Sequence, residues 1–239
     1  MLEKLLMKLS MRDTLSADEE ARLRSLPTER LMVPRHRTVS YAGQEAHHSI
    51  ILLEGLMCRY KDLRNGGRQI AGIHIAGDFP DLHNFTLKRP DDSLLAITPC
   101  EIAIVPHERL LELTNECPHL TRLLWFCTNL DAAIHREWVI SLGRRTAIQR
   151  VAHFFCEMWT RFDIVGLAQP DGFSLGMTQT ELAESMGLTP VHVNRTLKAL
   201  RQKELARFQG GFVEIYDLTA LKREAEFDPI YLSLERRPR

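Results

Sequence analysis

The apolar positions near the start of the chain follow a helical period. Four leucines within the first 26 residues fall on one helix face: Leu2, Leu5, Leu6 and Leu9. Further on, Ser16 and Glu19 have the spacing of a capping box, in which each side chain bonds the backbone N–H of the other residue. The pattern predicts an amphipathic helix followed by a second helical segment that begins at Ser16.

Between residues 31 and 105 the pattern changes to short apolar and β-branched runs separated by turn residues. These runs cover residues 50–53, 56–60, 69–75, 94–97 and 101–105. Asn65-Gly66-Gly67 lies between two of them and is a strong hairpin signal, because Asn and Gly adopt the positive φ angles of a tight turn. Short strands at this spacing predict an antiparallel β-sandwich or a jelly-roll-like β-roll.

The helical period returns after Pro106, first as far as Glu116 and then from Pro118 to Leu142 with no glycine or further proline. Along this long helix, apolar positions recur at steps of three and four: Leu120, Leu123, Cys127, Leu130, Ile134 and Trp138. Such a narrow stripe packs either on the core of its own domain or on the same helix of a second subunit. The pattern alone leaves both interpretations open.

Gly143 interrupts the long helix, and a further helix begins after it and extends to about residue 162. The last third of the chain then has the pattern helix, helix, hairpin, helix. We therefore expect an α+β protein in three parts: residues 1–116 with the N-terminal helices and the β-roll, 117–143 with the long helix, and 144–239.

Length and composition narrow the class of protein. A chain of 239 residues with 44% hydrophobic and 26% charged residues is typical of one or two globular domains, which excludes wholesale disorder. No apolar run approaches the roughly 18 residues of a membrane span, and the N-terminus does not have the pattern of a signal peptide. The five cysteines are odd in number, widely spaced and without a CxxC pair, which argues against a zinc site or a disulfide framework. We expect a soluble cytoplasmic protein.

The most informative segment is residues 177–200, which has the pattern of a helix-turn-helix. Thr178 and Glu181 have capping-box spacing at the start of the first helix. Gly187 lies where the turn needs a positive φ angle, and Thr189 precedes Pro190 as the cap of a second helix. The buried faces would be formed by Leu182, Ala183, Met186, Val193, Leu197 and Leu200.

The outward face of the second helix is suited to a nucleic acid. Lys and Arg balance Asp and Glu at 31 each over the whole chain, so any binding of DNA needs a local basic patch. From Thr189 to Arg207 there are five cations and one Glu, a local charge of +4. Arg can bridge guanine N7 and O6 in the major groove. Residues 206–208 and 212–215 then form a two-stranded wing around Gly210-Gly211, so the unit is expected to be a winged helix.

These motifs, together with Gly77-Asp78-Phe79 and the segment from Leu142 to His153, resemble the Crp/Fnr family of bacterial transcription regulators. The resemblance covers nearly all of the chain. It implies a cyclic-nucleotide-binding-like sensor roll, a dimerisation helix and a DNA-binding winged helix that binds a palindromic promoter site as a homodimer. It favours the dimer interpretation of the stripe on the long helix, and it adds RNA polymerase as a further partner.

The resemblance also implies roles for single residues. Arg195 falls on the family's guanine-reading Arg and Thr189 on a phosphate-contacting position, while Val191 replaces a base-reading Glu and could pack on a thymine methyl group. The expected DNA-binding residues are Thr178, Gln179, Thr189, Val191, His192, Asn194, Arg195 and Lys198.

The sensor half departs from the members of the family that bind cAMP. Leu82 stands at the position of their ribose-binding Glu, and Asp91-Asp92 lies near the position of their phosphate-binding Arg, where carboxylates would repel a phosphate. Arg89 would stand at the position of the phosphate-binding Arg only if the gap in the alignment with the family were placed differently. We therefore expect a regulator that does not respond to cAMP, and the residues identify no cofactor or effector.

The sequence also bears on other sensors and on enzymatic function. No cysteine precedes Cys58, which argues against an N-terminal iron–sulfur cluster. A haem sensor using His74, His83 or Cys58 and a thiol sensor using Cys100, Cys117 or Cys127 remain alternatives of the same fold. A cupin-like metal enzyme needs a His-x-His motif and a nearby Glu, and the chain has His47-His48 and isolated histidines instead. We expect no enzyme.

Overall fold

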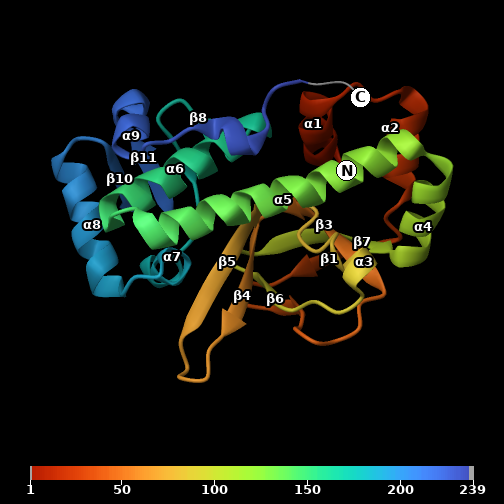
Figure 1. Cartoon of the computed structure of the whole chain (residues 1–239), viewed down its shortest axis with the longest axis horizontal. Coiled ribbons are helices and arrows are strands. Elements are labelled where there is room, and N and C mark those ends of the chain that lie inside the picture. Colours follow the sequence, from red (N-terminus) through yellow and green to blue (C-terminus); the bar gives the residue numbers. More distant parts are fainter. Residues whose placement is uncertain (1, 237–239) are drawn as a thin grey trace. The chain divides into compact units, whose positions relative to one another are not determined.

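The computed structural model describes residues 2–236, which form two compact units (Figure 1). Among these residues, the first unit holds 2–61, 73–132 and 233–236, and the second holds 62–72 and 133–232. The long helix α5 (Pro118–Arg144) contributes residues to both units, so the division falls inside a continuous helix.

Two antiparallel sheets form the β-roll expected from the strand pattern. The first has the order β1 (Glu29–Val33), β7 (Cys100–Pro106), β3 (His48–Glu54). The second has the order β2 (Thr38–Ser40), β6 (Ser93–Ala96), β4 (Leu56–Asp62), β5 (Arg68–Ile75). Gly55 turns β3 into β4 at a φ of 91°, where a Cβ atom would lie 2.5 Å from the carbonyl oxygen of Pro99. Only glycine fits this turn without displacing its neighbour.

The roll has two apolar layers. One contains side chains from both sheets, among them Ile50, Met57, Leu94 and Ile102. The other contains Ile51 and Leu53 of β3 together with leucines of four helices: α1 (Glu3–Arg12), α2 (Ala17–Ser25), α4 (His107–Glu116) and α5. Leu2, Leu5, Leu6 and Leu9 are buried in this layer, and Ser16 and Glu19 form the predicted capping box. A short helix, α3 (Asn84–Leu87), was not expected.

The second unit is a helical domain with a small sheet. Its helices are α6 (Ala147–Ile164), α7 (Gln179–Met186), α8 (Pro190–Gln202), α9 (Leu218–Glu224) and the 3-10 helix η1 (Pro229–Leu232). The sheet has the order β10 (Ala206–Gln209), β11 (Phe212–Ile215), β9 (Gly172–Ser174), β8 (Ala168–Gln169). The wing is therefore not two-stranded as expected: β9, in a segment with turn residues, pairs with β11 and ties the wing to the domain.

Two boundaries of the long helix differ from the sequence pattern. Gly143 does not end α5, which continues to Arg144, and the next helix begins at Ala147 with Thr146 as its cap. Of the helices within residues 2–236, none combines the length and the apolar character needed to cross a membrane.

The stripe predicted as a dimer seam needs correction, because the subunit itself already covers much of it. Leu120 and Leu123 are buried in the helix-covered layer of the roll, and Ile134 is also buried. Trp138 is buried and donates its indole N–H to Glu157 of α6. Cys127 and Leu130 are half-buried, and Cys127 packs against the same layer. The alternative interpretation, packing on the core of its own domain, fits these side chains better.

Candidate nucleic-acid interface

The helix-turn-helix is formed by local signals that the structure reproduces. The Thr178 hydroxyl accepts from the backbone N–H of Glu181, and the Glu181 carboxylate accepts from the backbone N–H of Thr178, which completes a capping box at the start of α7. Gly187 follows α7 at a φ of 61°, the left-handed conformation that turns the chain into the next helix. α8 then begins with Thr189 as its cap, whose hydroxyl accepts from the N–H of His192.

The two faces of α8 have opposite characters. Val193, Leu197 and Leu200 are buried, as expected for the face that packs on the domain. The opposite face exposes a row at helical spacing: Val191, Asn194, Arg195 and Lys198. Val191 is 72% exposed, which leaves an apolar contact available at the start of the helix. We call these four residues the recognition row.

The remaining expected DNA-binding residues lie around this row. Thr178, Gln179 and Thr189 are exposed at the starts of α7 and α8, whereas His192 is half-buried at the side of α8. The positive ends of the two helix dipoles therefore lie at this surface, which favours phosphate oxygens. The Thr189 hydroxyl, which accepts from His192, can donate to such an oxygen, whereas the Thr178 hydroxyl already donates to the Glu181 carboxylate.

Two of the five cations between Thr189 and Arg207 lie close to carboxylates, which reduces the positive charge of the basic patch. Lys203 is held by Glu224 of α9 at 2.8 Å, and Arg207 lies 3.8 Å from Glu214 across the wing. Among residues 2–236, no carboxylate lies within ion-pair distance of Arg195, Lys198 or Arg201. These three cations on one helix supply the charge available to an anionic partner.

A cleft of about 250 Å³ separates α8 from the wing. Its lining residues are Gln179, Asn194, Leu197, Lys198, Arg201, Arg207, Phe208 and Gln209. The lining is mainly polar, and its positive side chains are Lys198, Arg201 and the Arg207 that lies near Glu214. Such a lining suits a phosphate backbone better than an apolar small molecule.

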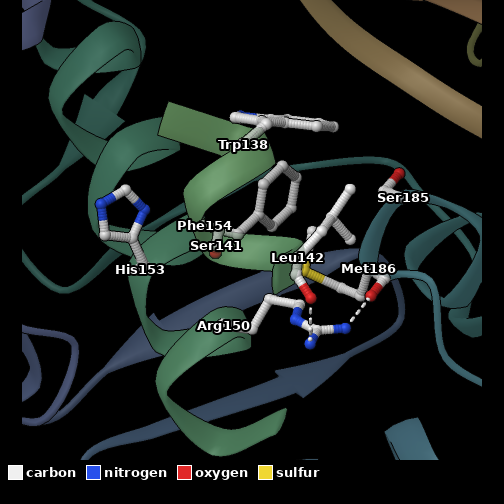
Figure 2. Close-up of a pocket in the computed structure, with 8 residues that line it drawn as sticks. All are labelled: Trp138, Ser141, Leu142, Arg150, His153, Phe154, Ser185 and Met186. Atoms are coloured by element: carbon white, nitrogen blue, oxygen red, sulfur yellow. Dashed lines mark hydrogen bonds between the residues drawn. The ribbon is translucent and has the colours of Figure 1, made fainter. Parts of the chain in front are cut away.

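Arg150 fixes the end of α7, a role that the sequence pattern did not indicate (Figure 2). From α6 its guanidinium donates to the carbonyl oxygen of Met186 at 2.5 Å and to that of Leu142 at 3.0 Å. A further bond reaches the carbonyl oxygen of Arg145 at 3.2 Å. The adjoining cavity of about 10 Å³ holds no more than about one water molecule, so it is a packing feature and not a ligand site. The one signal in the sequence was that Arg150 lies in the segment resembling the family.

The charged groups of the β-roll leave no free cation for a cyclic phosphate at Arg59. Arg59 of β4 is buried, and both oxygens of the Asp131 carboxylate accept from its Nη2 atom at 2.7 and 2.8 Å. Asp92 lies 3.8 Å from its Nε atom. Burial raises the pKa of nearby Asp81 to about 7, with a smaller opposing effect of Arg59. An anion would therefore meet a guanidinium already paired with a carboxylate, and the residues do not fit a cyclic phosphate.

The other sensor candidates are placed as follows. Leu82 is buried in the helix-covered layer, and Arg89 is exposed, 3.7 Å from Glu45. Cys58 is fully buried, and buried His74 lies 3.8 Å from Asp78. Among residues 2–236, no group of three His, Cys, Asp or Glu side chains could hold a metal ion.

A β-roll joined through a long helix to a winged helix with an exposed cationic recognition row defines a DNA-binding transcription regulator. Comparison with known families agrees, since residues 30–117 match the cyclic nucleotide-binding domain and residues 149–224 match the Crp-like helix-turn-helix domain. The chain belongs to the Crp/Fnr family of transcription regulators.

Individual relatives support this conclusion. The nitrogen fixation regulation protein FixK of Bradyrhizobium diazoefficiens is 33% identical over 166 residues, covering 67% of each chain. A probable transcriptional activator of Rhizobium leguminosarum bv. viciae is 32% identical, over 76% of this chain and 75% of its own. The solved structure of FixK2 from Bradyrhizobium japonicum is similar in fold, with a TM-score of 0.73 at 23% identity, covering 82% of this chain and 96% of that one.

Proposed function

We propose that the protein acts as a homodimer that places two copies of α8 in successive major grooves of a palindromic promoter site. The observation that carries the proposal is the recognition row, four side chains exposed on one face of a helix whose opposite face is buried. Two such helices related by a twofold axis match half-sites about 34 Å apart, one turn of the double helix. On promoter DNA in the cytoplasm, the dimer would meet RNA polymerase.

The surface proposed for the second copy is the outward face of α5. Trp125, Val139 and Ile140 are 66%, 70% and 50% exposed, and the smaller Ala132 and Ala133 lie between them. This face has the alternating steps of four and three that a coiled-coil seam has, through Trp125, Asn129, Ala132, Arg136 and Val139, of which Asn129 and Arg136 are polar. A second copy of the same helix covers such a face along its whole length, and burial of exposed apolar side chains stabilises the pair.

Within this proposal the residues have different tasks. Arg195 bonds guanine N7 and O6, and Val191 packs on a thymine methyl group. Thr178, Gln179, Thr189 and His192 lie beside the row, where contacts fix the orientation of the helix in the groove, and Lys198 contacts the backbone.

Arg195→Ala is expected to relax specificity, and Lys198→Ala is its matched control on the same helix face. A high-affinity site is selected from a randomised duplex library, and binding is measured by fluorescence anisotropy. Loss of the bidentate contact should cost about 1–3 kcal/mol of discrimination at one base pair. Lys198→Ala should weaken binding to all sequences alike. It should also reduce the slope of log affinity against log salt concentration by about one. Unchanged base preference in Arg195→Ala would contradict the reading role.

We also propose that cAMP does not regulate this protein, since Arg59 is already paired with Asp131. Addition of cAMP should leave the DNA affinity of the purified dimer unchanged, and calorimetry should show no binding heat in the micromolar range. A rise in affinity that saturates with cAMP would overturn this part of the proposal.

A further inference from the structure

Asn194 holds a contact that its neighbours in the recognition row do not share. Its side-chain Nδ2 atom donates to Oε1 of Gln179, at 3.4 Å. Gln179 is the first residue of α7, so this bond joins the two helices of the helix-turn-helix at their exposed edge. Both side chains are exposed and line the cleft between α8 and the wing, where they are accessible to DNA.

The bond leaves half of the asparagine amide available. An amide has two N–H donors and one carbonyl acceptor, and the bond to Gln179 uses one donor. The second N–H and Oδ1 lie on the same planar group. Adenine presents the complementary pair in the major groove, the N7 acceptor and the N6 donor. No other base presents this pair of groups there, and guanine presents two acceptors.

Gln179 also restricts which way the amide can turn. A free asparagine amide on an exposed helix can rotate about its χ2 angle, and the two orientations exchange donor and acceptor. The acceptor Oε1 of Gln179 favours the orientation in which Nδ2 faces α7. A preorganised group loses less conformational entropy when it binds. The contact therefore sets, already in the free protein, the amide orientation that fits one base better than the others.

We propose that Asn194 is a specificity-determining residue that binds adenine N6 and N7 in each half-site, and that Gln179 is its positioning residue. The proposal rests on the proposed function of α8 as the helix in the major groove. Asn194 is adjacent to Arg195, and a helix rises about 1.5 Å per residue, less than the 3.4 Å between base pairs. The adenine should therefore lie at the base pair next to the guanine that Arg195 contacts, or within about one pair of it.

The test uses the full-length dimer and the duplex selected for the unaltered protein. Each base pair of the half-site is replaced in turn by the other three, and the affinities of the protein and of Asn194→Ala are measured by fluorescence anisotropy. The unaltered protein should lose about 5- to 150-fold in affinity when the adenine is replaced. In Asn194→Ala this penalty should fall to less than about twofold at that pair alone, while the penalty at the guanine is retained.

Gln179 is tested by two substitutions that differ in the acceptor they leave. Gln179→Ala removes the acceptor and should reduce the adenine penalty without abolishing it. Gln179→Glu keeps a carboxylate oxygen that can accept from Asn194, so it should restore the adenine penalty. Its negative charge near the phosphates should at the same time weaken binding to every duplex by a similar factor. A purely phosphate-binding Gln179 would give the same adenine penalty in all three proteins.

The outcomes separate this inference from the function on which it rests. If the unaltered protein selects no preferred sequence, the proposed function fails. If it selects a palindrome but Asn194→Ala keeps the full penalty at every base pair, the function holds and the adenine-reading role of Asn194 is overturned. Thermal unfolding followed by circular dichroism verifies that the variants are folded, as expected for substitutions of two exposed side chains.

Discussion

Glu157→Ala is expected to lower the free energy of unfolding by about 3–5 kcal/mol, the usual cost of removing one partner of a buried ion pair. Glu157 is completely buried on α6, and three donors converge on its carboxylate. They are the indole N–H of Trp138, the guanidinium of Arg161 and the hydroxyl of Tyr231, at 3.1, 3.1 and 2.9 Å. Alanine would remove the shared acceptor from two buried donors, Trp138 and Arg161, and from the half-buried Tyr231.

Urea unfolding followed by circular dichroism measures the effect. Glu157→Gln should cost less than Glu157→Ala, since an amide oxygen still accepts from Trp138 or Tyr231. The matched control is Asp163→Ala, an exposed acid on the same helix, which should change the free energy of unfolding by less than about 0.5 kcal/mol. A loss in Glu157→Ala no larger than that of the control would show that the network contributes little to stability.

The double substitution Val139→Glu and Ile140→Glu is expected to separate the proposed dimer. Two exposed apolar side chains of the outward face of α5 would become like charges facing their copies across the seam. Light scattering should then give the mass of one chain, 27.5 kDa, in place of twice that value. Affinity for a palindromic duplex should fall by about 10²- to 10⁴-fold, because two linked contacts become two independent ones.

Met32→Glu is the control for the loss of an exposed apolar side chain, since Met32 is 74% exposed on β1 and lies outside the proposed seam. It should leave the dimer and its DNA affinity intact. A dimeric Val139→Glu and Ile140→Glu protein would refute the outward face of α5 as the seam. Substituting Ile134 is a poor test of the interface, because that side chain is buried inside the subunit.

The helix-turn-helix could be predicted in detail because its signals are local. Thr178 with Glu181, Gly187, and Thr189 with Pro190 each fix the backbone within a few residues, whatever the rest of the chain does. The strand pattern predicted the β-roll for a similar reason, since alternating runs and the Asn65-Gly66-Gly67 turn need only neighbouring strands.

The face of α5 that points inward could not be predicted from its own period. Two stripes run along this helix, one through Leu120 and Leu123 and another through Trp125 and Val139, and each has steps of three and four. The first is buried because Leu5 and Leu9 of α1, more than 100 positions away, pack against the same layer. Tertiary packing decides between two such stripes.

Strand pairings and ion pairs between residues distant in the sequence could not be predicted for the same reason. The pairing of β9 with β11 joins strands of three and four residues across the helix-turn-helix. Lys203 adds to the positive charge counted along the sequence, but in the fold Glu224 lies 2.8 Å from it. A count of charges along the sequence cannot show which of them neutralise each other.

The pairing of Arg59 with Asp131 has a consequence for how such a regulator responds to its surroundings. A dissociable anion leaves when its concentration in the cell falls, whereas a carboxylate attached to the same polypeptide is present at all times. The ion pair that neutralises this guanidinium therefore does not depend on the concentration of any metabolite. The proposed indifference of DNA binding to cAMP would then hold at every concentration of that nucleotide in the cell.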